Sequence, residues 1–158
     1  VIISQNTVIG KNGFGFNQGF PNSNIFFHIG AVKISDDVFI GSNCNIDRGH
    51  IDDTIIGDFV RVDNQVHIAH NCEIGKNSIL AGKSAISGSV KLGENVILAG
   101  DVGIADNLKI GSNSFISGGT KVFKNFPENS KIGGYPARSL YDWQKIQVKL
   151  NKMLSKIK

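Results

Sequence analysis

Residues 62–86 read VDNQVHIAHNCEIGKNSILAGKSAI and place an aliphatic residue at every sixth position. The same spacing runs through twelve consecutive positions from Ile56 to Val122. The residue after each aliphatic is usually Gly, Ala or Ser, and the residue two before the next aliphatic is mostly Val, Ser or another small residue. A period of six fits neither an amphipathic helix nor a simple alternating strand, so it indicates a repeated structural unit.

Each unit of six is best explained as a short strand followed by a corner. The aliphatic side chain points inward, the small residue lets the backbone turn, and the second small or β-branched residue points inward again. Three such units close one triangular coil, and stacked coils share a continuous core, which predicts an all-β solenoid. Cys44 and Cys72 fall in an inward position, so we expect buried, inert thiols.

The repeat extends upstream through Ile34, Ile40 and Ile46, with two interruptions. A Gly/Phe/Asn-rich excursion covers residues 10–31, and about four extra residues loop out within 47–55. Solenoids usually place insertions at one corner, often the functional one. We therefore expect a solenoid domain over residues 1–126 that carries both excursions.

The C-terminal part has a different pattern. Residues 127–138 predict a turn or linker, and residues 139–158 predict a basic amphipathic helix capped by Ser139. Its apolar seam and its lysine stripe lie on different helix faces. The seam is Trp143, Ile146, Leu150, Met153 and Ile157, and the stripe is Lys145, Lys149, Lys152 and Lys156.

Composition excludes several classes. The chain has 158 residues, 19% of them charged, and no apolar run near the ~18 residues that span a bilayer. Residues 138–158 hold six basic residues against one acid, whereas residues 1–137 hold 11 against 12, so the near-neutral body does not indicate nucleic-acid binding. The first residues show no signal-peptide pattern, and the chain begins within the repeat, as a fragment of a longer protein would. The two cysteines show no pairing pattern, which favours a reducing, cytoplasmic compartment.

His70 is the main candidate for chemistry. It lies two places after an aliphatic position, at a corner, and Gly88 and Asp106 occupy the same position in the next two coils. The stacking therefore puts His70 about one coil, ~5 Å, from the Gly88 backbone. An exposed imidazole beside a glycine N–H is a plausible base next to an oxyanion donor, although a single histidine is more often structural.

Asp63 occupies a position that is elsewhere Gly, Ala or Ser, so it breaks the repeat without a packing benefit. It lies ~15–20 Å from His70 by strand rise, so the two could cooperate only across a subunit interface. The alternative is a surface corner carboxylate. A zinc site using His67 and His70 is a further alternative, but His28 and His50 fall in the loops and no third histidine lies nearby on the repeat, so we expect no metal.

Four motifs give a more specific indication: GFGF at 13–16, IDRG at 46–49, DDTIIGD at 52–58 and DNQVHIAHN at 63–71. With these, nearly all of residues 1–143 resembles the UDP-3-O-(3-hydroxyacyl)glucosamine N-acyltransferases of Gram-negative lipid A biosynthesis, a hexapeptide-repeat family. The resemblance implies a left-handed parallel β-helix and a homotrimer. It also implies transfer of a (3R)-hydroxyacyl group from acyl carrier protein to the 2-amino group of a UDP-sugar, without a metal or organic cofactor.

The resemblance also assigns residue roles. His70 corresponds to the general base, Gly88 to the oxyanion donor, and Asp63 and Asn64 to residues that shape the site and contact the acyl donor. Asn107 stands where members often have a second histidine, and Phe123 stands near an acyl-length position. The lysine stripe would dock the acidic carrier protein, and a uridine-binding domain would have to precede Val1.

Two other functions fit the sequence. A hexapeptide-repeat acetyltransferase that uses acetyl-CoA on an amino sugar would share the fold and the corner histidine. A non-catalytic β-solenoid would need neither the histidine nor a ligand, and its lysines would be a solvated face.

Overall fold

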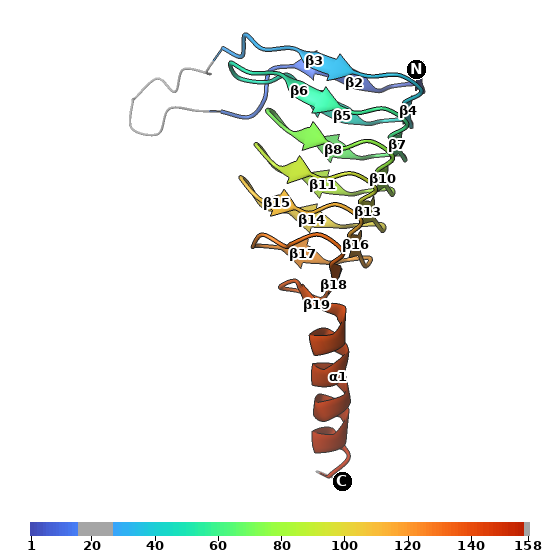
Figure 1. Cartoon of the computed structure of the whole chain (residues 1–158), viewed down its shortest axis with the longest axis vertical. Coiled ribbons are helices and arrows are strands. Elements are labelled where there is room, and N and C mark those ends of the chain that lie inside the picture. The colour runs from blue at the N-terminus through green and yellow to red at the C-terminus, as the bar shows by residue number, and fades with distance from the viewer. Residues whose placement is uncertain (16–26, 157–158) are drawn as a thin grey trace.

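The computed structural model describes residues 1–15 and 27–156 and shows a left-handed parallel β-helix with one C-terminal helix (Figure 1), which confirms the predicted fold class. Its strands form three sheets, one on each side of the solenoid. The first sheet contains β1 (Ile2–Ile3), β4 (Phe39–Ile40), β7 (Arg61–Val62), β10 (Ile79–Leu80), β13 (Ile97–Leu98), β16 (Phe115–Ile116), β18 (Lys131–Gly133) and β19 (Arg138–Ser139).

The other two sheets complete each coil. The second contains β2 (Val8–Lys11), β5 (Asn45–Asp47), β8 (His67–Ile68), β11 (Ala85–Ile86), β14 (Gly103–Ile104) and β17 (Lys121–Val122). The third contains β3 (Val32–Ile34), β6 (Thr54–Ile56), β9 (Glu73–Ile74), β12 (Lys91–Leu92) and β15 (Lys109–Ile110).

Strands in successive coils pair in register, so equivalent aliphatic residues stack directly. Ile68 pairs with Ile86, and Ile86 pairs with Ile104, which is the predicted interval of one coil. These side chains are almost fully buried and fill the interior of the solenoid. Cys44 and Cys72 are buried there as predicted, and burial raises the pKa of the Cys72 thiol to about 12, which keeps it protonated and unreactive.

A left-handed backbone residue at each corner explains the asparagine content of the chain. The corner residues Asn71, Asn77, Asn95, Asn107 and Asn113 have φ between 56° and 61°. Asparagine is enriched in this conformation, in which most side chains are strained. Asparagine is therefore the commonest residue at these left-handed positions, although Phe59, Gln65 and Lys83 adopt the same conformation at other corners.

Both excursions meet beside the second and third sheets. The N–H of Ile29, near the end of the first excursion, donates to the His50 carbonyl of the second at 2.8 Å. The Ala31 N–H donates to Asp53 at 2.7 Å, and Lys33 pairs with the same carboxylate at 2.6 Å. The Lys33 bond, helped by the Ala31 N–H, lowers the pKa of Asp53, so this tie between the excursions persists in weakly acidic solution.

The repeat does not stop at residue 126, contrary to the expectation of a linker over 127–138. Strand β18 pairs in parallel with β16, and Ile132 is fully buried as a further core residue. The six-residue spacing does not predict the coil that contains Ile132, because the segment around Pro127 departs from that spacing. Strand β19 then turns back antiparallel to β18 and leads into the helix.

Helix α1 spans Leu140–Leu154 and begins at Ser139, whose side chain accepts a hydrogen bond from the Asp142 N–H. It extends beyond the last coil along the solenoid (Figure 1), and none of its residues is buried. Lys156 lies past its end, so only three of the four stripe lysines are helical. The predicted end of the seam, Ile157, lies outside the described residues. In the part of the chain that the structure covers, no helix is both long and apolar enough to cross a membrane.

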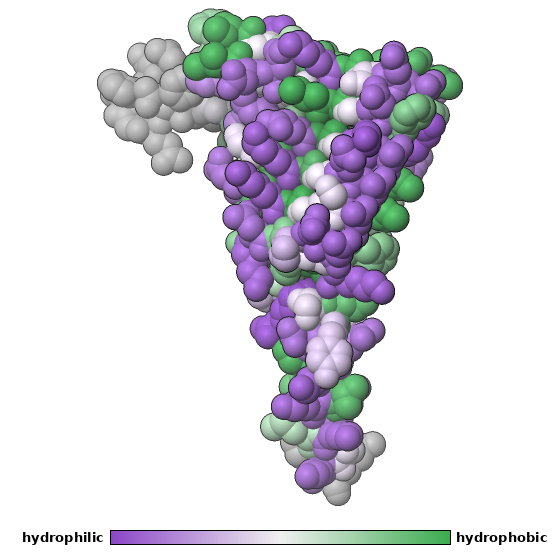
Figure 2. All heavy atoms as spheres, viewed as in Figure 1, coloured by the Kyte–Doolittle hydropathy of each residue, from purple (hydrophilic) through white to green (hydrophobic). Residues whose placement is uncertain are grey.

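The three outer faces of the solenoid differ in chemistry. The first sheet exposes an apolar column at Phe39, Ile79, Ile97 and Phe115, which the exposed Arg61 interrupts between Phe39 and Ile79. Green patches follow this edge of the solenoid in Figure 2. The second sheet has small residues outward, including Ala85 and Gly103, and the third has Glu73, Lys91 and Lys109. The apolar column is therefore the face suited to contact another protein surface.

We predict that the inward position controls stability. Leu92 is 3% exposed, whereas its neighbour Lys91 points outward. Leu92→Ala should lower the free energy of unfolding by about 2–5 kcal/mol, because it leaves a cavity between stacked coils, and Lys91→Ala should change it by under ~1 kcal/mol. Denaturant unfolding at one fixed protein concentration measures both. Equal losses in the two variants would contradict this assignment of the core.

Candidate active site

His70 lies at the corner between β8 and β9, packed directly against the backbone of the next coil. The Ser89 N–H donates to the His70 carbonyl at 2.9 Å. A β-carbon at Gly88 would lie 2.7 Å from Cε1 and 2.8 Å from Nε2 of His70, and one at Gly13 would lie 2.8 Å from its Cδ2. The imidazole therefore occupies the space that side chains at either glycine would need. The predicted proximity of His70 and Gly88 is confirmed.

Asn71 orients the imidazole. Its Oδ1 lies 3.0 Å from His70 Nδ1 and also accepts the His50 N–H at 2.9 Å. Its Nδ2 donates to the Asp52 carbonyl at 3.1 Å, which fixes which end of the amide faces the ring. Because Oδ1 can only accept, Nδ1 carries the proton in neutral His70 and Nε2 holds a lone pair. This is the tautomer that a general base needs when Nε2 faces substrate.

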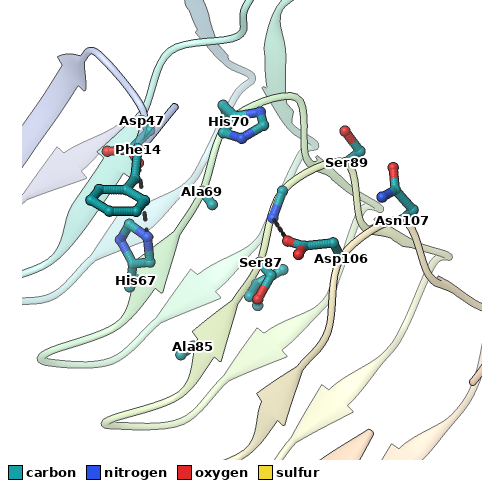
Figure 3. A pocket seen from close by; sticks show the side chains of 12 residues that line it. Phe14, Asp47, His67, Ala69, His70, Ala85, Ser87, Ser89, Asp106 and Asn107 are labelled. Carbon is teal, nitrogen blue, oxygen red and sulfur yellow. Dashed lines mark hydrogen bonds and ion pairs between the residues drawn. The ribbon is translucent and has the colours of Figure 1, made fainter. Parts of the chain in front are cut away.

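The imidazole opens into a hollow of about 440 Å³, the His70 hollow, which is lined by residues of four successive coils (Figure 3). Asp47 lies at one side of it, is 1% exposed, and pairs with Lys11 Nζ at 2.8 Å. His67 Nε2 lies 3.8 Å from the other Asp47 oxygen. Phe14 covers His67 from the first excursion (Figure 3). Asp106 and Asn107 complete the opposite side.

The Gly88 N–H is not free in this structure. It donates to Asp106 Oδ1 at 2.9 Å, as the dashed line in Figure 3 shows. Asp106 comes from the next coil, so His70 and Asp106 flank Gly88 from opposite sides. An oxyanion can therefore use this N–H only after the Asp106 carboxylate has moved.

Asp63 and Asn64 have structural contacts that the repeat pattern did not reveal. Asp63 Oδ2 accepts the Gly82 N–H at 3.1 Å, and its Oδ1 accepts from Asn64 Nδ2 at 2.9 Å. Asn64 Oδ1 accepts the Ser42 N–H at 2.8 Å. The prediction noted only that Asp63 has no packing benefit, whereas its carboxylate has a structural role as a hydrogen-bond acceptor that joins two coils. Neither residue lines the His70 hollow of its own chain.

Phe123 lies on a neighbouring groove of about 290 Å³, together with Ala85, Gly103 and Lys121. Its ring is 59% exposed and meets Tyr135 edge-on, with 6.2 Å between centroids. Ala85 belongs to this groove and to the His70 hollow, so the two are contiguous. The groove is the natural place for an extended apolar group that reaches His70.

The excursions bring His28 and His50 to His70, although the sequence placed them away from it. The His28 ring is buried and lies 5.2 Å from that of His50 and 5.4 Å from that of His70, centroid to centroid. Over residues 1–15 and 27–156, no group of three His, Cys, Asp or Glu residues has a geometry that could hold a metal ion. His28 thus packs against the imidazole of the candidate base.

Basic residues gather at the base of α1. Lys145 and Lys149 line a hollow with Lys124, which follows β17, and with Arg138 of β19; Asp142 is the acidic residue in the same lining. Lys152 lies further along the helix, and all four stripe lysines are exposed. The helix and the end of the solenoid thus form one predominantly positive surface.

Sequence reasoning missed Asn71, Asp47 and Asp106 as site residues. Asp106 stood in the stacking column that pointed to Gly88, so the same one-coil interval could have identified it. Asn71 and Asp47 belong to quoted motifs, DNQVHIAHN and IDRG, but only the folded excursions show what they contact.

Comparison with known proteins supports the assignment of the fold and the resemblance. Residues 53–88 match the family model described as bacterial transferase hexapeptide (six repeats). The whole chain is 53% identical to UDP-3-O-acylglucosamine N-acyltransferase 2 of Legionella pneumophila, over 46% of that protein. It is 51% identical over 98% of its length to UDP-3-O-acylglucosamine N-acyltransferase of Rickettsia typhi, over 44% of that protein.

The chain thus spans about half the length of these curated relatives. Among solved structures, the UDP-N-acetylglucosamine acyltransferase of Arabidopsis superposes with a TM-score of 0.76 at 28% identity, over 89% of this chain and 48% of that one. The resemblance seen in the four motifs is confirmed at the level of sequence and fold.

We predict that Asn71 sets the tautomer of His70. Neutral His70 should carry its proton on Nδ1 in the wild type and become a mixture of tautomers in Asn71→Ala, because the acceptor that faces Nδ1 is removed. Nitrogen chemical shifts of labelled histidine, recorded in alkaline solution where the ring is neutral, report this directly. Asn77→Ala is the matched control, since Asn77 has the same left-handed backbone, with φ of 58° against 59°. An unchanged His70 tautomer in Asn71→Ala would refute the role.

Proposed function

We propose that this chain is the catalytic solenoid of an N-acyltransferase. It would move a (3R)-hydroxyacyl group from acyl carrier protein to the 2-amino group of a UDP-3-O-acylglucosamine, in the cytoplasmic synthesis of lipid A by a Gram-negative bacterium. The observation that carries this proposal is the half-buried His70, held by Asn71 in the tautomer of a base beside the Gly88 backbone. Relatives that are 51–53% identical to this chain are named UDP-3-O-acylglucosamine N-acyltransferase, which supports the proposed acceptor and reaction type.

The chemistry follows from that geometry. His70 Nε2 takes a proton from the amine as the amine nitrogen attacks the thioester carbonyl carbon, giving a tetrahedral intermediate. The Gly88 N–H stabilises its oxyanion once Asp106 has moved. The carbon–sulfur bond then breaks, and the imidazolium returns its proton to the departing phosphopantetheine thiolate. The donor brings its own thioester, so the proposal requires no metal or organic cofactor.

A homotrimer would complete the site. The exposed side chains of Phe39, Ile79, Ile97 and Phe115 support self-association through the first sheet, with the charged Arg61 among them. We assign Asp63 to the neighbouring subunit's site, where it orients or electrostatically supports His70. Its bonds to Gly82 and Asn64 hold the carboxylate in place for that purpose.

Three residues are proposed to bind substrate. Asn64, beside Asp63, contacts the acyl donor at the subunit boundary. Asn107 lies on the wall of the His70 hollow, where members of the family often have a second histidine. Phe123 closes the neighbouring groove, whose small residues Ala85 and Gly103 leave room for an acyl chain, so its ring would limit chain length.

Acyl carrier protein would dock on the positive surface formed by Lys145, Lys149, Lys152 and Lys156. Lys124 and Arg138 extend this surface to the last coil. Carrier proteins are small and acidic, and the charge of this chain is concentrated at its C-terminal end. Electrostatic complementarity of this kind mainly affects encounter rate and orientation.

We predict that His70→Ala in the full-length protein lowers the acyl-transfer rate by at least ~10², because the amine loses its proton acceptor. The assay follows amide formation with matched 3-hydroxyacyl groups on acyl carrier protein and on coenzyme A. Sedimentation should still show the wild-type oligomer, since the corner side chain carries no core contacts. Near-wild-type turnover of His70→Ala would remove His70 from the mechanism. For the wild-type protein, activity with acetyl-CoA alone would indicate an acetyltransferase. No wild-type activity with any donor would favour a structural solenoid.

Charge reversal tests the docking surface. Lys145→Glu with Lys149→Glu should raise KM for acyl carrier protein about tenfold or more at low ionic strength, with the defect shrinking as salt screens the charges. The kcat and the response to UDP-sugar should change little. Lys83→Glu with Lys109→Glu makes the same charge change on the body and should leave KM near the wild-type value. A fall in kcat with an unchanged carrier KM would refute docking.

A further inference from the structure

In the His70 hollow, the Gly88 N–H is a hydrogen-bond donor that two acceptors would use, the Asp106 carboxylate and the thioester oxygen of the donor substrate. The Gly88 N–H belongs to a buried residue, and Asp106 Oδ1 accepts it at 2.9 Å. A buried N–H without a partner is costly, so the carboxylate stabilises the free protein at this point. The proposed reaction needs the same N–H for the thioester oxygen, and one N–H cannot give a linear hydrogen bond to both acceptors.

We propose that Asp106 is a positioning residue that masks the Gly88 N–H in the free protein and is displaced by the carbonyl oxygen of the acyl donor. This inference rests on the proposed function. The masking contact satisfies the buried donor while the hollow is empty, and the substrate takes it over when it binds. Asp106 therefore sets how readily the donor reaches its reactive position.

The side chain of Asp106 is free to move. The residue is exposed, at the corner after β14, so rotation about its side-chain bonds carries the carboxylate into solvent. Gly88 has no side chain that would obstruct an incoming carbonyl, and His70 lies on its other side. The path between the two flanking side chains thus leads directly to the N–H.

The charge of Asp106 also requires its departure. A carboxylate that stayed on the Gly88 N–H would lie beside the developing oxyanion, and two negative groups at that distance repel. The contact is therefore compatible with the free protein and incompatible with the tetrahedral intermediate. Asp106 therefore affects the reaction by controlling access to the Gly88 N–H, beyond its structural bond to the neighbouring coil.

The same kind of bond recurs at other corners, where it has only a structural role. Asp58 Oδ1 accepts the Asp36 N–H at 3.0 Å, and Ser112 Oγ accepts the Glu94 N–H at 3.0 Å. None of these residues lines the His70 hollow. Asp58→Ala therefore removes an equivalent bond between coils and provides a matched control for loss of stability.

The kinetic test compares three variants of the full-length protein. Asp106→Ala frees the N–H and should raise kcat/KM for the acyl carrier protein donor about tenfold, since a bond to a charged acceptor no longer has to be broken. Asp106→Asn keeps an acceptor without charge and should fall between the wild type and Asp106→Ala. Asp58→Ala should leave kcat/KM close to the wild-type value. An Asp106→Ala variant that is folded but has unchanged or lower kcat/KM would overturn the proposal.

A second readout does not depend on turnover. The Gly88 amide should exchange with solvent faster in Asp106→Ala than in the wild type. An unreactive acyl-pantetheine analogue, in which an amide nitrogen replaces the thioester sulfur and the carbonyl is kept, should restore its protection. Faster exchange that this amide analogue does not reverse would refute competition for this N–H. A wild-type protein that forms no amide from any carrier-bound donor would refute the proposed function instead.

Discussion

The hydrogen-bond ladder between successive coils determines the rest of this structure. Each strand pairs in parallel and in register with the strand one coil away, so a residue meets its equivalent in the next coil. Strands in a sheet lie about 4.8 Å apart, so equivalent side chains in successive coils are separated by the same fixed distance. The aliphatic positions use this spacing to fill the core, and the corner positions use it to build the site.

At the His70 corner, the ladder brings together groups from three coils. His70, Gly88 and Asp106 are equivalent positions, so the backbone pairing that stabilises the solenoid also sets their separation. The excursions supply what the repeat lacks. His50 and Asp52 hold the Asn71 amide that faces the imidazole, and Phe14 covers His67 at the edge of the hollow. The repeat thus fixes the position of His70 relative to Gly88 and Asp106, and the two excursions orient the imidazole and partly enclose the hollow.

The six-residue period was sufficient to predict the fold, the buried cysteines and the stacking of His70 on Gly88, because each depends only on register. Contacts made by excursions could not be predicted, since His28 contacts both His70 and His50 through loops whose path the period does not specify. Side-chain bonds between coils were also missed: residue type alone showed Asp63 as an exception, whereas its carboxylate satisfies the Gly82 N–H. The last coil escaped detection because Pro127 and its neighbours break the spacing before Ile132 returns to the core.

The most direct measurement of the central claim is a crystal structure of the full-length protein with an unreactive acyl-pantetheine analogue, in which an amide nitrogen replaces the thioester sulfur and the carbonyl is retained at the reacting position. The account predicts that this carbonyl oxygen lies ~2.7–3.1 Å from the Gly88 nitrogen, with His70 Nε2 facing the carbon and the Asp106 carboxylate turned away. The acyl chain should follow the groove toward Phe123. A bound ligand whose carbonyl lies elsewhere, with Asp106 still on the Gly88 N–H, would contradict the account.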